Sequence, residues 1–167
     1  MPSIKMSVKG NPKLNDMGKL AEKIASKVAE ELKKETDTRL ENVIVDSYLN
    51  EYGKAFEVRE KGGTVSSFVD GNKAEVRVSG DKITFVEFGS GVHYNGNAGS
   101  SPHPKGFENG MLIGEYGKKH GRKDNWIVTS EGNEVVRSQG VPMQSPMWNA
   151  TQAVRKNLKE IVKESLK

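Results

Sequence analysis

The apolar residues near the N-terminus recur at helical spacing. Apolar side chains three and four positions apart form a single stripe along an amphipathic helix. Asn15 and Asp16 both have the short polar side chain that favours a helix start. We therefore predict a helix over residues 15–40, with small alanines beside the stripe that permit close packing against a sheet. The stripe consists of Leu14, Met17, Leu20, Ile24, Val28 and Leu32.

A second amphipathic helix is predicted at the C-terminus, over residues 146–165. Pro146 stands at its first position, where the missing N–H costs nothing, and Ser145 is a suitable cap. Lysines crowd the later turns, where cations interact favourably with the helix dipole. The apolar face of this helix consists of Met147, Ala150, Val154, Leu158, Ile161 and Val162.

Between these helices the apolar period changes to two, which indicates strands. The Lys-Gly-Gly sequence at 61–63 separates the first two runs and predicts a hairpin. The simplest arrangement is an antiparallel meander of three or four strands. The runs are 55–59, 64–69, 73–78 and 82–88.

Two other segments complete the predicted elements. Residues 43–49 fit either a continuation of the first helix or a strand, and residues 126–129 predict a further strand. The fold class is therefore α+β, with a small antiparallel β-sheet packed by an N-terminal and a C-terminal amphipathic helix.

Residues 89–125 interrupt this pattern with nine glycines and no sustained periodicity. Structureless loops of this length are uncommon in compact domains and are usually functional or disordered. The segment is predicted to be either a long mobile loop or an arm that becomes ordered against a neighbouring subunit. Residues 1–13, with two prolines and a glycine, are predicted to form a flexible arm.

Composition limits the classes of protein. A chain of 167 residues suits a single domain over residues 1–167, and 34% hydrophobic with 29% charged residues is polar for a globular protein. The absence of cysteine excludes disulfides, thiolate metal sites and cysteine nucleophiles. No run approaches the roughly 18 apolar residues of a membrane span, so no membrane partner is predicted.

The residues that could carry chemistry are few. His93, His103 and His120 all lie in the glycine-rich segment, at spacings that match no metal-binding motif, and are expected to be solvated. Glu87 has no evident catalytic partner, and is expected to pair with a Lys or Arg or to accept main-chain N–H groups. A hydrolase that uses Glu87 with His93 or His120 is the least favoured class. No phosphate-binding glycine motif is complete, so neither an enzyme nor a cofactor is predicted.

The net charge of +4 is mild, and charges of both signs alternate along the helices as on a solvated surface. One basic cluster, at residues 118–123, could contact phosphates. It supports an alternative function, that of a small basic nucleic-acid-binding accessory protein.

Two short segments resemble the neck or tail-completion proteins of long-tailed bacteriophages. Residues 86–91 read Val-Glu-Phe-Gly-Ser-Gly, and residues 142–150 read Pro-Met-Gln-Ser-Pro-Met-Trp-Asn-Ala. With the glycine-rich insertion between them, they place the region from 83 to about 162 in the family's pattern. Family members usually have Thr where Ser90 stands, and often Phe-Leu where Met147 and Trp148 stand.

The resemblance implies a virion structural protein made in the cytoplasm of a bacterial host. Such proteins form a ring, commonly of six copies, that joins the head connector to the tail tube or its terminator, with DNA passing through the lumen. The expected partners are therefore further copies of the chain, the connector and the tail proteins. The candidate interface residues are Glu87, Phe88, Gly89, Tyr94, Phe107, Tyr116, Lys118, Lys119, Arg122, Lys123, Met147 and Trp148.

Overall fold

The computed structural model describes residues 15–90, 103–105, 125–129 and 135–167. They belong to two compact units. The helical unit comprises Met1–Leu40, Gly63–Gly80 and Pro146–Lys167, and the sheet unit comprises Glu41–Gly62 and Asp81–Ser145. The predicted arm at 1–13 lies outside the described residues, as does most of the predicted loop at 89–125. The single domain stays a prediction.

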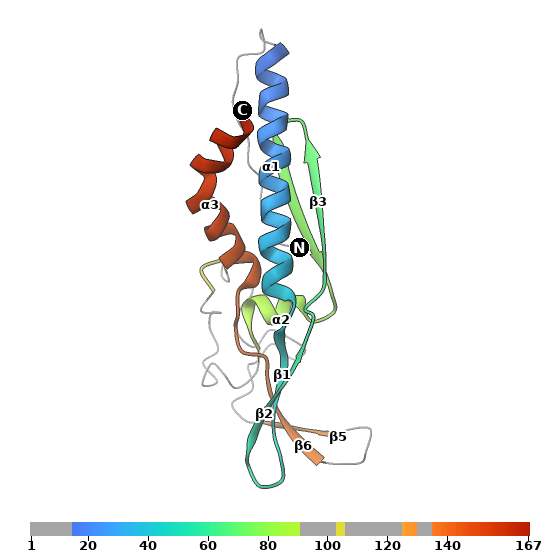
Figure 1. Cartoon of the computed structure of the whole chain (residues 1–167). Coiled ribbons are helices and arrows are strands. Elements are labelled where there is room, and N and C mark those ends of the chain that lie inside the picture. The colour runs from blue at the N-terminus through green and yellow to red at the C-terminus, as the bar shows by residue number, and fades with distance from the viewer. Residues whose placement is uncertain (1–14, 91–102, 106–124, 130–134) are drawn as a thin grey trace. The chain divides into compact units, whose positions relative to one another are not determined.

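The helical unit contains both long helices and one β-hairpin. Helix α1 spans Asn15–Leu40 and helix α3 spans Pro146–Ser165, so both predicted helices are confirmed. Strands β3 (Thr64–Asp70) and β4 (Lys73–Ser79) pair antiparallel along their full length. Helix α1 packs against α3 and against this hairpin, and Figure 1 shows it between them. The predicted α+β class, with terminal helices around an antiparallel sheet, is confirmed.

The core of this unit follows from the apolar spacing of its elements. Small and branched side chains of α1 face the hairpin and α3, and β4 buries every second residue, as expected of a strand with one covered face. Met17, the first residue of the predicted stripe that the structure describes, is 46% exposed. The buried apolar residues are Ala25, Val28, Ala29, Leu32 and Leu40 of α1, Val65 of β3, Ala74, Val76 and Val78 of β4, and Met147, Ala150, Val154 and Ile161 of α3.

The sheet unit is built on a four-stranded antiparallel sheet. Its strands are β1 (Val43–Leu49), β2 (Ala55–Glu60), β5 (Trp126–Thr129) and β6 (Val135–Gly140), in the order β2-β1-β6-β5. Residues 43–49 therefore form a strand, and the strand predicted at 126–129 is confirmed. The register of β1 shifts twice, between Ile44 and Asp46 against β2 and between Ser47 and Tyr48 against β6.

The predicted meander holds only for β3 and β4, which pair antiparallel. Strand β2 pairs with β1 instead, so Lys61-Gly-Gly63 does not form a hairpin turn. At Gly63 the backbone has φ +152°, and a Cβ there would lie 2.6 Å from the carbonyl oxygen of Ser79. This glycine therefore permits the close approach of two chain segments where β3 begins.

The strand predicted at 82–88 is also wrong, because Ile83–Phe88 forms the short helix α2. Branched and aromatic residues favour strands, yet here three consecutive residues, Val86, Glu87 and Phe88, are buried. A half-covered strand buries alternate residues, whereas a helical turn within a packed environment can bury three in a row. Gly89 ends the helix with φ +81°, and its N–H bonds to the carbonyl oxygen of Phe85.

None of the helices among the described residues combines the length and the apolar character needed to span a membrane.

Candidate functional site

The two segments that carry the family resemblance lie side by side. We call residues 86–90 and 141–145 the motif junction. Ser90 donates its main-chain N–H to the carbonyl oxygen of Val141 (2.7 Å), and its Oγ accepts the N–H of Val141 (3.0 Å). One serine thus uses main chain and side chain to hold a partner some fifty positions away. Threonine has the same hydroxyl, so the family's residue can make the same bond.

Gln144 is the central residue of the motif junction. Its main-chain N–H donates to the carbonyl oxygen of Val86 (3.0 Å). Its side-chain amide binds the main chain of Ile44 in β1, accepting the N–H and donating to the carbonyl oxygen, both at 2.8 Å. Beside it, the Ser145 hydroxyl donates to the carbonyl oxygen of Glu87 (3.3 Å). Gln144 therefore ties together both motif segments and the first strand of the sheet.

A buried carboxylate and imidazole complete the motif junction. Glu87 Oε1 lies 3.0 Å from His103 Nε2, and both side chains are almost wholly buried. The main-chain N–H of Lys105 donates to His103 Nδ1 (3.0 Å), so the imidazole is neutral and carries its proton on Nε2. The His103 ring also meets Phe88 edge-on, with 4.6 Å between centroids.

This pair corrects one prediction: His103 is not solvated, because it is buried and bonded to Glu87. A catalytic base must reach a substrate proton, whereas both nitrogens of this buried ring already have protein partners. The pair therefore anchors residues 103–105 to α2. His93 and His120 lie outside the described residues.

A polar network joins β1 to β6. The Asp46 carboxylate accepts hydrogen bonds from the Tyr48 hydroxyl (2.9 Å) and the Ser138 hydroxyl (3.0 Å). The Ser47 hydroxyl donates to the carbonyl oxygen of Gly140 (2.8 Å). Desolvation, together with the hydrogen bond to Asp46 and its charge, raises the pKa of Tyr48 to about 12.

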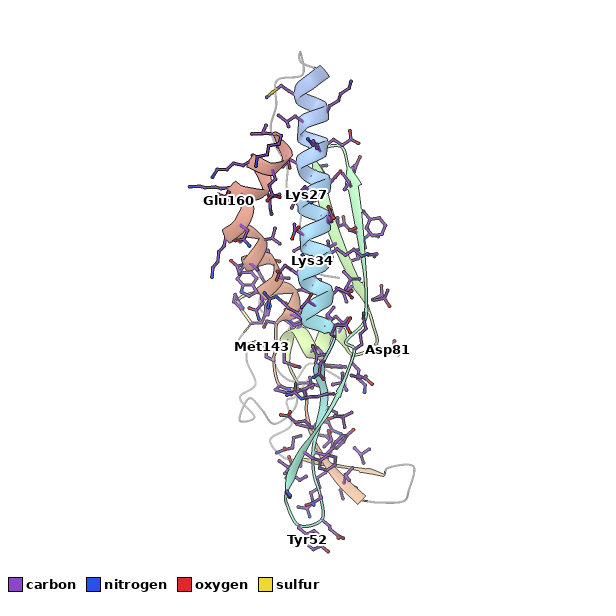
Figure 2. The ribbon with its side chains drawn as sticks, in the orientation of Figure 1. Lys27, Lys34, Tyr52, Asp81, Met143 and Glu160 are labelled. Carbon is purple, nitrogen blue, oxygen red and sulfur yellow. The ribbon has the colours of Figure 1, made fainter. Side chains whose placement is uncertain are left out.

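The outer strand β2, in contrast to this polar network, is exposed to solvent. All six of its residues are exposed, including Phe56 at 42% and Val58 at 38%. The Phe56 ring stacks on Tyr48, with 5.4 Å between centroids, and only part of it is covered. At the turn between β1 and β2, Tyr52 is strongly exposed, and Figure 2 shows it at the tip of the hairpin. Ile127 of β5, at the other edge of the sheet, is 69% exposed.

The predicted interface residues fall into two groups. Of those described, Glu87 and Phe88 are buried in α2, Gly89 ends that helix, Met147 is buried and Trp148 is half-buried. Their role at an interface stays a prediction. Seven lie outside the described residues: Tyr94, Phe107, Tyr116, Lys118, Lys119, Arg122 and Lys123.

Sequence reasoning missed the exposed residues of β2 and β5. Alternation of apolar and charged residues predicts that 55–59 is a strand, but not whether its apolar face is covered. Within the described ranges, no group of three or more His, Asp or Glu side chains is placed to hold a metal ion.

Comparisons of the chain with protein-family models, with curated proteins and with solved structures find no match.

Proposed function

We propose that the protein is a bacteriophage virion component of the neck or tail-completion type, which forms a ring that joins the head connector to the tail tube. The observation that carries the proposal is the motif junction. Two segments singled out by their resemblance to that family, residues 86–91 and 142–150, are bonded to each other across a long glycine-rich insertion. The Gln144 N–H donates to the carbonyl oxygen of Val86, and the Ser145 hydroxyl donates to that of Glu87. A chance resemblance in two unrelated places gives no reason for such contact.

The chemistry of the motif junction also supports a structural role. Its polar side chains bind main-chain groups and each other, which fixes three chain segments in one arrangement. Such networks specify a single geometry when their members are satisfied. A ring subunit needs this rigidity, because small errors in each copy accumulate around the ring.

The nucleic-acid-binding alternative depends on the basic cluster at 118–123, which lies outside the described residues. Its distinguishing property is affinity for DNA that falls steeply as salt rises.

The test is deletion of the gene in a phage that carries it, followed by electron microscopy of the particles. We expect separate heads and tails, and restoration of joined particles when the wild-type protein is supplied in trans. Mass spectrometry of purified wild-type virions should detect the chain. Normal joined virions after deletion, or virions that lack the chain, would refute the proposal.

A further inference from the structure

Both outer strands of the sheet unit are edges. In the described part of the chain, β2 is bonded only to β1 and β5 only to β6. An edge strand presents the main-chain N–H and C=O groups of alternate residues to a further strand. Natural proteins usually protect such edges, yet β2 is exposed along its whole length and carries Phe56 and Val58.

The strand directions allow the sheet to continue from one copy to the next. All three strand pairs are antiparallel, so β2 and β5 run in opposite directions. A β2 strand placed beside the β5 strand of a neighbour, with the sheets facing the same way, would also be antiparallel. The edges are thus complementary in direction.

We propose that copies of this chain associate head to tail through these edges, with β5 of one copy pairing antiparallel with β2 of the next. This deepens the proposed ring function. The edge pairing stands on the geometry of the sheet, and only closure into a ring rests on the proposed function. A head-to-tail contact of this kind closes into a ring when the rotation between copies permits it.

The side chains on the two edges match in face and in chemistry. Directly opposed residues on neighbouring strands lie on the same face of a sheet. Phe56 is opposite Tyr48, Tyr48 is opposite Ser138, and Ser138 is opposite Trp126, so Phe56 and Trp126 share a face. Because side chains alternate along a strand, Val58 lies on this face also.

The favoured register places Val128 opposite Phe56 of the next copy, and Trp126 opposite Val58. Four apolar side chains then form one row across the contact. On the other face, the exposed Ile127 would lie against the aliphatic stem of Glu57. Aromatic and branched pairs of this kind stabilise adjacent strands.

A contact between two β2 strands is the competing arrangement. Centred on Val58, it would set Glu57 of each copy opposite Arg59 of the other. It would make a closed pair and leave β5, with Ile127 mostly exposed, uncovered. Head-to-tail pairing covers both edges of every copy, and the observations favour it.

Disulfide trapping tests the arrangement, because the chain has no cysteine of its own. Singly substituted Phe56→Cys and Val128→Cys proteins are mixed at high concentration and oxidised, and the double variant is oxidised alone. We expect a cross-linked product containing one copy of each single variant, and a ladder of covalent oligomers from the double variant. The control replaces Phe56→Cys with Phe68→Cys on the exposed face of β3.

Two outcomes would overturn the inference. One is a Val128→Cys protein that cross-links to Phe68→Cys as efficiently as to Phe56→Cys, or that cross-links to neither. This result must hold both for purified protein and for assembled particles. The other is efficient linkage of Val58→Cys to itself, which would indicate contact between two β2 strands.

A second test compares Phe56→Glu with Phe68→Glu, since these rings are exposed to similar extents, 42% and 48%. We expect Phe56→Glu to weaken self-association about tenfold or more, whereas Phe68→Glu leaves it unchanged, because only Phe56 lies on a proposed contact edge. Circular dichroism and thermal melting establish that both variants fold. Equal assembly of the two overturns the edge pairing.

The failure of the edge pairing and that of the proposed function are distinguishable. If wild-type chain is present in virions and both glutamate variants restore joined particles, the neck function stands without the edge pairing. If the wild-type chain is absent from virions, the neck function fails, whatever the cross-linking shows.

Discussion

Strands β4 and β2 contain nearly the same sequence and have different surroundings. Residues 74–77 of β4 read Ala-Glu-Val-Arg, and residues 56–59 of β2 read Phe-Glu-Val-Arg. In each strand the arginine pairs with the glutamate two positions before it. The valines differ sharply: Val76 is 2% exposed and Val58 is 38% exposed.

The difference comes from what covers each strand. Helix α1 packs against the β3–β4 hairpin, and β4 buries Ala74, Val76 and Val78. Strand β2 exposes all six residues. The local sequence thus determines the extended backbone and the ion pair within each strand. What packs over the apolar face of the strand comes from elsewhere in the chain. For β2, we propose that it comes from another copy.

The sharpest test of this comparison places the same charge in both strands. Val76→Asp buries an unpaired carboxylate and should lower the free energy of unfolding by about 4 kcal/mol or more. Val58→Asp leaves its carboxylate in water and should cost at most about 1 kcal/mol, from strand preference. Urea unfolding at equal, low protein concentration measures both. Similar losses would show that β2 is covered within its own chain.

The entry into the β3–β4 hairpin gives the next largest effect. Gly63→Ala adds a Cβ 2.6 Å from the Ser79 carbonyl oxygen, at a backbone angle unfavourable to alanine. We expect a loss of about 2 to 3 kcal/mol in the free energy of unfolding.

Gly18→Ala in α1 is the matched control, because its added Cβ meets no atom within 4 Å. Alanine favours helix over glycine, so this change should stabilise the protein by about 0.5 to 1 kcal/mol. A gain of stability from both substitutions would refute the close approach at Gly63.

Removal of the Gln144 side chain, in the motif junction, should cause a smaller loss of stability. This side chain binds β1, the strand that pairs with β2. Gln144→Ala removes both amide bonds to Ile44 and should cost about 2 kcal/mol. Gln139→Ala, in β6, is the control and should change stability by no more than about 0.5 kcal/mol. Hydrogen exchange should show faster exchange of the Ile44 amide in the Gln144 variant alone. Unchanged protection of that amide would contradict the assigned bond.

Tyr48, which stacks on Phe56 of β2, gives a test that depends on pH. Its pKa is about 12 in the folded protein against 10.0 for an unperturbed tyrosine, so the folded state retains the proton more tightly. The contribution of this raised pKa to the free energy of unfolding is complete below pH 10 and is lost as the pH rises toward 12. Absorbance titration should show a late phenol transition that Tyr48→Phe removes. A variant whose titration matches the wild-type curve would disprove the assignment.

The helices were predictable from sequence because their signals are local. The apolar spacing of α1 and α3, with Pro146 at a helix start, is contained in windows of a few turns. The positions of β2, β3 and β4 were also evident from alternation. The pairing of β3 with β4 was part of the predicted meander. The partner of β2 was not predicted, because Lys61-Gly-Gly63 resembles a hairpin turn, while β2 pairs with β1 instead.

The candidate site shows the same limit. The two motif segments were singled out together, and they contact each other through Gln144 and Ser145, but their resemblance to the phage family stays a prediction. The helical form of 83–88 could not be predicted, since its branched and aromatic residues favour a strand and only tertiary contacts overturn that preference. The burial of His103 could not be predicted either, because the glycine-rich segment around it has no periodicity that would indicate its partner.

The two register shifts in β1 bear on the number of copies that the proposed contact could accommodate. Such shifts bend a strand and increase its local twist. Copies joined edge to edge by a flat sheet form an unlimited ribbon, whereas copies related by a constant rotation close into a ring when that rotation divides a full turn. If copies join through β2 and β5, the irregularities at Ile44 and Ser47 help to set that angle. Removal of the two register shifts from β1 would then convert a closed ring with a fixed number of copies into an open filament.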